Sequence, residues 1–307
     1  MKVFPHNFNP HSNSGPNKFT RTLFAALIRG GKISVVSDQR QADVEFCLIQ
    51  QQAYKVKPMV LRLDGIWFNS DQDYNTQNAP IKYAYENADA VVFQSEFNKK
   101  LTEHWFGFHK NSQVIHNAAD LSLIHSLNSS FWNNKFGKDV EVWSCASNWR
   151  PHKRLDENIR YFLEFAPKDA IFAVAGALGM DDAKKITNDK RVVLMGDLDY
   201  IALLSLYKRS STFVHLAYLD HCPNVVVDAQ AAGCQVICSS TGGTSEIVSN
   251  GKVINEPVWD FSPIDLYNPP KLDFNNINLI DSELVEDSKS SIEKCAKRYH
   301  SVFEGVI

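Results

Sequence analysis

The chain has 307 residues, a length that suits two domains of ordinary size. With 44% hydrophobic and 22% charged residues, it has the balance of a globular protein with sizeable cores. Its formal net charge of −3 lacks the basic surplus of a general nucleic-acid binder, and no apolar run reaches the roughly 18 residues of a membrane-spanning helix.

The first half of the chain alternates strands and helices, which predicts a parallel sheet covered on both faces. Apolar runs predict strands at residues 2–4, 44–49, 59–63, 90–93 and 114–116. Helical periodicity is expected at residues 17–29, 81–87 and 96–106. The last of these helices carries two lysines and an aromatic row that runs to Phe108. That spacing is typical of core packing, with peripheral membrane contact as the alternative.

Residues 126–138, rich in Asn, Ser, Lys and Gly, are expected to link this half to a second one. In the second half, strands are expected at residues 140–144, 171–175, 192–195, 212–216 and 235–240. The intervening helices are expected at residues 156–165 and 200–208, and a long terminal helix at 282–303. We therefore expect domains at 1–130 and 131–281, followed by a final helical segment at 282–307.

An acidic stretch follows the strand at 212–216. It places Asp220 in a loop and Asp228, eight residues later, inside an apolar helix that Pro223 should begin and Gly233 should end. Asp228 lies too deep to cap that helix, and a buried carboxylate needs hydrogen-bond partners. The two hydroxyls of a ribose would supply them. A single Asp on the polar edge of a helix is the alternative, and spacing alone favours it.

A glycine turn follows the next strand. Gly242 and Gly243, in residues 241–248, are expected to enter a helix with hydroxyl caps. Glycines let the backbone approach a ligand closely, and free N–H groups at a helix start attract anions. A Gly-Gly pair alone is more often a plain turn, but the order of strand, acidic loop, helix, strand and glycine turn is specific.

A basic turn enters the helix predicted at 156–165. It carries Arg150, Lys153 and Arg154 at the positive end of that helix, where the helix dipole disfavours cations. A bound anion such as a diphosphate would relieve this repulsion. A solvated basic turn fits the spacing equally well.

Taken together, these motifs resemble the nucleotide-sugar glycosyltransferases of the GT-B fold, in particular the large retaining family 4. That family carries two glutamates separated by seven residues, then small residues, Gly, a strand and a Gly-Gly turn. This chain matches the pattern with Asp220 and Asp228 in place of both glutamates. The resemblance covers most of residues 140–250 and, more loosely, the first 120 residues.

The resemblance implies GT-B architecture, with two Rossmann-like domains facing a cleft and the terminal helix crossing back to the first domain. It implies retaining transfer of a hexose or pentose from a UDP- or GDP-linked sugar to a hydroxyl of a glycan or other acceptor. Neither a metal nor another cofactor is expected. Asp228 would hold the ribose and Asp220 a hydroxyl of the donor sugar. The charge on the leaving diphosphate would be stabilised by the side chains of Lys153 and Arg150 and by the N–H groups of Gly242 and Gly243.

Further site positions follow from the same resemblance. The family's phosphate-binding Lys corresponds to Lys153, whereas its Arg position holds Asn148, so Arg150 or Arg154 would substitute. Asp64 ends a strand where many members have a His aimed at the donor sugar. Gly15 lies in a stretch similar to the family's glycine-rich loop. The remaining expected donor-binding positions are Gly196, Asn224 and Thr244.

Two alternatives share the fold. A GT-B epimerase would use the same nucleotide site with acid/base residues and no acceptor, and an inactive sugar- or partner-binding module would keep only the fold. The six scattered cysteines include no Cys-x-x-Cys pair, and the first residues are too polar for a signal peptide. The sequence therefore predicts a cytoplasmic protein with reduced thiols.

Overall fold

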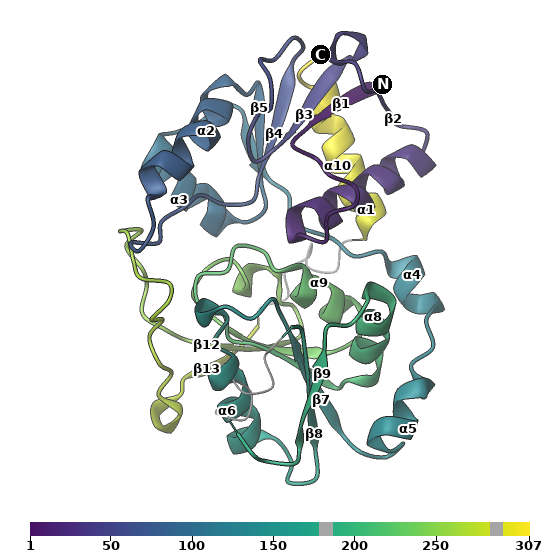
Figure 1. The fold of residues 1–307 in the computed structure, drawn as a ribbon, viewed down its shortest axis with the longest axis vertical. Helices are drawn as coiled ribbons and strands as arrows, with labels where there is room; N and C mark the ends of the chain where they lie inside the picture. The colour runs from purple at the N-terminus through teal and green to yellow at the C-terminus, as the bar shows by residue number, and fades with distance from the viewer. Residues whose placement is uncertain (178–186, 283–290) are drawn as a thin grey trace.

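The computed structural model describes residues 1–177, 187–282 and 291–307. Two β-sheets, each flanked by helices, form two α/β domains that face each other (Figure 1). This is the class expected where strands and helices alternate along the chain.

The first sheet has the order β2-β1-β3-β4-β5-β6, and every neighbouring pair of its strands is parallel. Its strands are β1 (Lys2–His6), β2 (Ser34–Val35), β3 (Val44–Leu48), β4 (Met59–Leu63), β5 (Ala90–Phe93) and β6 (Ser112–Val114). Its main helices are α1 (Gly15–Arg29), α2 (Tyr74–Asn87) and α3 (Glu96–Phe106). β3, β4 and β5 are buried along their whole length, which explains why they read as nearly continuous apolar runs.

Some elements of the first domain differ from expectation. α2 begins at Tyr74 and not at residue 81, because Asp73 caps a polar first turn and Pro80 lies inside the helix. β6 covers 112–114 and not 114–116, since residues 115 and 116 lie beyond the end of the sheet. β2 is a short exposed edge strand whose two residues carry no apolar pattern.

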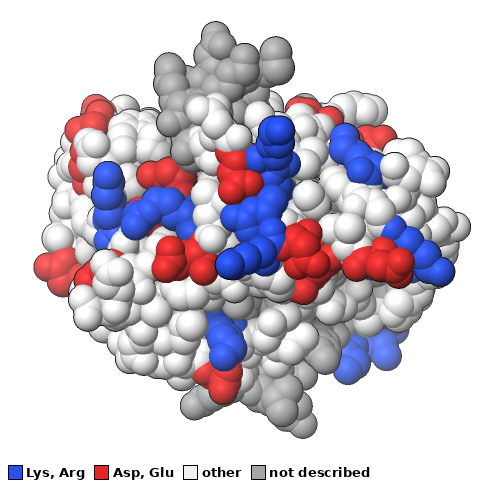
Figure 2. All heavy atoms as spheres, turned by 90° about the horizontal axis from the view of Figure 1, so that it is seen from below, with Lys and Arg blue, Asp and Glu red and all other residues white. Residues whose placement is uncertain are grey.

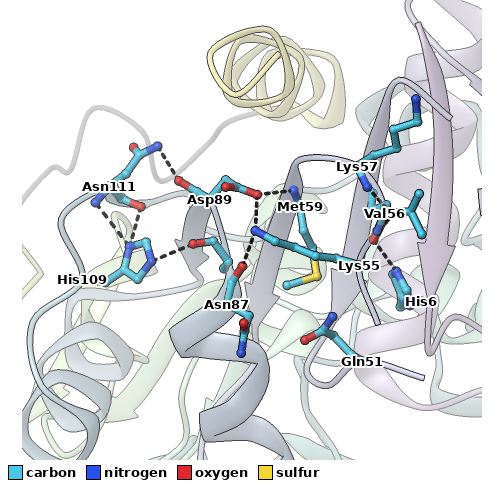
Figure 3. Close-up of polar contacts among 12 residues, drawn as sticks. His6, Gln51, Lys55, Val56, Lys57, Met59, Asn87, Asp89, His109 and Asn111 are labelled. Atoms are coloured by element: carbon cyan, nitrogen blue, oxygen red, sulfur yellow. Dashed lines mark hydrogen bonds and ion pairs between the residues drawn. The ribbon is translucent and has the colours of Figure 1, made fainter. Parts of the chain in front are cut away.

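Polar side chains tie down the loops at the amino ends of these strands, away from the second domain (Figure 3). The Asp89 carboxylate accepts hydrogen bonds from the Met59 N–H and the Lys55 ammonium. Buried Glu45 accepts from the backbone N–H groups of Val56 and Lys57 and contacts His6 Nε2 at 2.9 Å. A buried carboxylate is tolerated here because hydrogen-bond donors surround it.

The second sheet has the order β13-β12-β11-β10-β7-β8-β9 and is parallel except for β13 against β12. Its strands are β7 (Val142–Ala146), β8 (Ile171–Ala175), β9 (Val192–Gly196), β10 (Thr212–His215), β11 (Gln235–Ser239), β12 (Gly251–Ile254) and β13 (Leu279–Asp281). Helices of this half are α4 (Leu121–Ser126), α5 (Asn133–Phe136), α6 (Leu155–Phe165), α8 (Tyr200–Arg209) and α9 (Asn224–Ala231).

The second half also corrects some expectations. Pro223 caps α9 from outside with an extended backbone and is not in its first turn. Residues 241–248 enter only a short 3₁₀ turn at Ser245–Ile247, not an α-helix. The segment expected as a linker, 126–138, contains α5 and a 3₁₀ turn at Ser130–Trp132, whose buried Trp132 packs in the second core.

The terminal helix α10 (Ile292–Glu304) packs against α1 in the first domain (Figure 1). Buried Tyr299 and Phe303 join the core there, and the ring of Phe303 meets that of Phe46 edge-on at 6.1 Å. The helix starts after its cap Ser291, later than the predicted residue 282. Residues 283–290 of that prediction lie outside the described part of the chain.

The connection between β12 and β13 also reaches the first domain, as the extended segment along one side of Figure 1 shows. We call residues 256–270 the strap. Ile264 pairs with Asn69, donating its N–H to the Phe68 carbonyl at 3.1 Å. Trp259 and Phe261 pack among first-domain rings such as Phe97. The strap thus ties the second sheet to α3 and to the loop after β4.

On the face seen in Figure 2, Lys and Arg side chains are interspersed with Asp and Glu. No helix among the described residues is both long enough and apolar enough to pass through a bilayer. The aromatic residues of α3 are mostly packed. The Trp105 indole N–H donates to the Phe261 carbonyl at 2.9 Å, and the Phe106 ring lies at an angle to that of Tyr85 with centroids 5.8 Å apart. Phe108 is exposed. All six cysteines are buried and unbridged.

Candidate functional site

The carboxyl ends of β4 and β5 face those of β7 and β10 across the domain interface, because parallel strands all end at the same edge of a sheet. The starts of α1 and α9 also meet there, and the Asn224 amide donates to the Gly15 carbonyl at 3.1 Å. Two positions that the sequence placed in the donor site, Gly15 and Asn224, are therefore in direct contact across the interface.

Asp220 lies at the centre of a compact charged cluster in the loop after β10. Its Oδ2 accepts from the Lys153 ammonium at 2.6 Å and lies 3.0 Å from His215 Nε2. Its Oδ1 accepts from the backbone N–H of His221 at 3.0 Å. Burial alone would raise the pKa of Asp220, but the Lys153 charge and the His215 hydrogen bond outweigh it and hold the pKa well below its usual range. The carboxylate is an anionic acceptor.

The glycine turn packs directly on this loop. Gly242 pairs with Asp220, and the Gly243 N–H donates to the Asp220 carbonyl at 2.7 Å. A Cβ on Gly242 would collide with the Asp220 backbone, and one on Gly243 would collide with the His221 carbonyl. Gly242 also has φ +82°, which favours glycine. Both glycines are therefore needed for loop packing, and the Gly243 N–H is already engaged within the protein.

Asp228 lies on α9 at the edge of an interdomain pocket and is 5% exposed. The Tyr200 hydroxyl lies 3.2 Å from its Oδ1. Burial raises the pKa of Asp228 to about 7, although the nearby Lys18 charge and the Tyr200 hydrogen bond oppose the rise. Lys18 of α1 lies 3.6 Å above the Tyr200 ring and reaches this pocket from the first domain. The pocket is lined by Lys18, Phe19, Thr22, Ala118, Tyr200, Asn224 and Asp228.

The basic turn separates its cations. Arg154 has φ +49°, points inward and is 1% exposed, and its guanidinium forms a two-pronged ion pair with Glu256 at 2.8 Å for each hydrogen bond. Arg150 and Asn148 remain exposed, and Lys153 is half-buried beside Asp220. Within this turn, Lys153 contacts Asp220 and Arg150 faces solvent, whereas Arg154 pairs with Glu256, the first residue of the strap.

Asp64 follows β4 at the first-domain side of the interface and forms an ion pair with buried Arg62. Arg62 also donates to the Asn117 side chain at 2.7 Å, and the Asn117 amide donates to Asn224 at 2.9 Å. A chain of polar contacts thus runs from Asp64 to α9.

The last two predicted positions, Thr244 and Gly196, make few contacts with the other site residues. The Thr244 hydroxyl is buried and has no hydrogen-bond partner among the described residues. Gly196 ends β9 with an exposed surface, and its carbonyl accepts from the Gly176 N–H at 2.8 Å. In the described part of the chain, no group of three or more His, Cys, Asp or Glu side chains is arranged to hold a metal ion.

Similarity to a known protein family lies mainly in the second domain. Residues 128–260 match the family described as glycosyl transferases group 1. Asp220, Asp228, Lys153 and the glycine turn all fall inside the matched residues. A search of curated proteins finds no match.

Solved glycosyltransferases share the arrangement of the whole chain. HepE of Anabaena, solved with UDP-glucose, is 12% identical, with a TM-score of 0.69 and coverage of 99% of this chain and 100% of that one. Sucrose-phosphate synthase of Thermosynechococcus elongatus is 12% identical, with a TM-score of 0.69 and coverage of 100% and 94%. WaaG, a glycosyltransferase of lipopolysaccharide biosynthesis, is 12% identical, with a TM-score of 0.64 and coverage of 98% and 95%. The two domains of this chain together therefore have the GT-B fold.

Several residues of this site were not found by sequence reasoning. The Glu246 carboxylate of the second domain accepts hydrogen bonds from the N–H groups of Glu96 and Phe97 at 2.6 and 2.7 Å, so it caps α3 of the first domain. Lys18 and Tyr200 meet at Asp228 from different domains. No local pattern marks these residues, because Glu246 and Lys18 meet their partners across the domain interface, and Tyr200 meets Asp228 between two helices of the second domain.

Proposed function

We propose that this chain is a retaining glycosyltransferase. It moves a hexose or pentose from a UDP- or GDP-linked donor to a hydroxyl of a glycan or other acceptor. The observation that carries the proposal is the ion pair of Lys153 with Asp220 in the second domain, within the residues that match the glycosyl transferases group 1 family and eight residues before Asp228. A cation for a diphosphate, an acceptor for a sugar hydroxyl and a buried acid for a diol are thus grouped on one domain.

Each group has a chemical task in this scheme. The ammonium of Lys153 and the exposed guanidinium of Arg150 stabilise the negative charge that develops on the leaving diphosphate. The Asp220 carboxylate accepts a hydroxyl of the donor sugar and fixes the anomeric carbon toward the acceptor. Asp228, once ionised, accepts both hydroxyls of the ribose. The diphosphate oxygen that departs takes the proton of the acceptor hydroxyl on the face where that hydroxyl attacks.

Protein side chains supply the positive charge for the leaving group, so we propose transfer without a metal ion. UDP-glucose is the first donor to test, because HepE was solved with it. A nucleotide at one hundred times its dissociation constant stabilises the fold by about 2.7 kcal/mol, which a thermal-shift screen detects readily. We expect UDP or GDP to raise the melting temperature, while CMP has little effect.

Turnover is then measured with the selected nucleotide sugar and a panel of hydroxyl acceptors, with and without EDTA. Lys153→Ala should abolish most transfer, whereas the control Lys252→Ala removes only an exposed lysine near Asp281 on the sheet edge. NMR of the anomeric proton of the product reports retention. Binding of no nucleotide, or isomerisation of the sugar without transfer, would overturn the proposal.

A further inference from the structure

His215 is the last residue of β10, a strand held between β7 and β11 inside the second sheet. Its backbone is registered against Cys238 of β11, and its ring lies parallel to that of Phe213, with centroids 6.3 Å apart. The side chain is 5% exposed. The sheet therefore fixes where Nε2 points, which is toward Asp220 Oδ2 at 3.0 Å.

Lys153 bonds the same oxygen but is not held by a strand. It is the last residue of the 3₁₀ turn Pro151–Lys153, and the ammonium at the end of its long side chain is 2.6 Å from Asp220 Oδ2. Under the proposed function, Lys153 must turn from Asp220 toward the donor diphosphate. The Asp220 carboxylate, with a 13% exposed side chain, would then lose its nearest positive charge. A buried carboxylate that loses a partner either takes up a proton or rotates away.

We propose that His215 is a positioning residue that keeps the Asp220 carboxylate oriented and ionised while Lys153 binds the donor. This inference rests on the proposed function. With its proton on Nε2, the imidazole donates to Oδ2, and the His221 N–H continues to hold Oδ1. A carboxylate has about four acceptor directions, so directions remain for a sugar hydroxyl.

The neutral state of the ring suits this task. Burial lowers the pKa of His215, and the Lys153 charge lowers it further, against the opposing effect of Asp220. A neutral donor holds the carboxylate without competing with Lys153 for the diphosphate. The other imidazoles near Asp220, those of His152 and His221, also have pKa values lowered to about 4, chiefly by burial. Lys153 is therefore the cation that contacts the Asp220 carboxylate in this cluster.

The first test needs neither ligand nor turnover. The pKa of the Asp220 carboxyl is measured by ¹³C NMR in Lys153→Ala, which imitates the departure of the lysine, and in Lys153→Ala combined with His215→Leu. We expect the second protein to show a carboxyl pKa higher by about one unit or more, because it lacks the last side-chain donor. Equal pKa values in the two proteins would overturn the inference even if the enzyme were fully active.

The second test uses turnover. His215→Leu should lower kcat by about 10- to 100-fold while UDP affinity stays within about twofold, and His215→Gln, which restores an N–H near Nε2, should recover most of kcat. His109→Leu is the control, because it removes another buried imidazole that bonds only backbone groups in the first domain. Equal loss of kcat in His215→Leu and His215→Gln would mean that the ring only fills space. If His215→Leu does not fold, His215→Met takes its place. Absence of transfer in the wild type would instead refute the proposed function.

Discussion

Replacing Asp228 with Asn should stabilise the ligand-free protein and weaken nucleotide binding at the same time. Asp228 is 5% exposed, and burial raises its pKa from 3.8 to about 7. The folded protein therefore binds a proton more tightly than the unfolded chain does. It follows that the contribution of Asp228 to stability is most favourable below pH 3.8 and is lost as the pH rises through 7.

The size of the effect follows from that rise in pKa. The pKa rises from 3.8 to about 7, and each unit of this rise corresponds to about 1.4 kcal/mol. Above pH 7 the ionised carboxylate therefore destabilises the fold by up to about 4 kcal/mol. Asn cannot ionise, so Asp228→Asn removes this cost. The gain should be largest at pH 8, smaller at pH 5, and close to zero near pH 3.8.

Thermal unfolding of both proteins at pH 8 and pH 5 measures this difference. Tyr200→Phe is the matched control, because it removes the hydroxyl that bonds Asp228 Oδ1 but leaves the carboxyl in place. That control should lower stability, and mainly above pH 7. A stability difference between wild type and Asp228→Asn that does not change with pH would refute the assignment of a raised pKa.

Nucleotide binding should move in the opposite direction. An ionised Asp228 accepts both ribose hydroxyls, whereas an amide has a single acceptor oxygen. Loss of one hydrogen bond to a charged group costs about 1.5–3 kcal/mol, or roughly 10- to 150-fold in affinity for UDP. Calorimetry should also show that wild-type affinity for UDP increases from pH 6 to pH 8, because the ribose selects the ionised form. Equal affinity of both proteins at pH 8 would exclude Asp228 from the ribose site.

Three further predictions concern other charged residues of the second domain. Lys153→Ala should weaken UDP binding, measured by calorimetry, with little change in the thermal midpoint, and unchanged affinity would rule out a phosphate contact. Asp220→Ala should lower turnover at least tenfold while UDP affinity stays close to wild type, and loss of UDP binding would assign Asp220 to the nucleotide instead of the sugar. Glu256→Ala leaves the buried Arg154 guanidinium unpaired and should destabilise the protein by about 3–5 kcal/mol in urea unfolding. A change below about 1 kcal/mol would mean that solvent reaches Arg154.

The strands were predictable because burial on both faces of a parallel sheet leaves a local, nearly continuous apolar run. β3, β4 and β5 show this directly. α2 was cut short in the prediction because its first turns are polar and Pro80 interrupts the apolar pattern, although tertiary contacts keep it helical. The strap was not predicted because it has no periodic apolar pattern of its own. Contacts with the first domain determine its conformation.

The sequence by itself determined the α/β class, the resemblance to a glycosyltransferase and the depth of Asp228, because periodicity and turn chemistry act between residues close in the chain. Only the tertiary structure decided which charge meets which. Lys153 and Asp220 are 67 positions apart, Arg154 and Glu256 are 102 apart, and Glu246 caps a helix that begins 150 positions earlier. From sequence, Lys153 was matched to the phosphate-binding lysine of the family, whereas Arg150 and Arg154 were alternatives for its arginine. The structure separates these two: Arg154 has a left-handed backbone and a buried side chain, and Arg150 is exposed. Partners of buried charges are set by proximity in space, which no local pattern encodes.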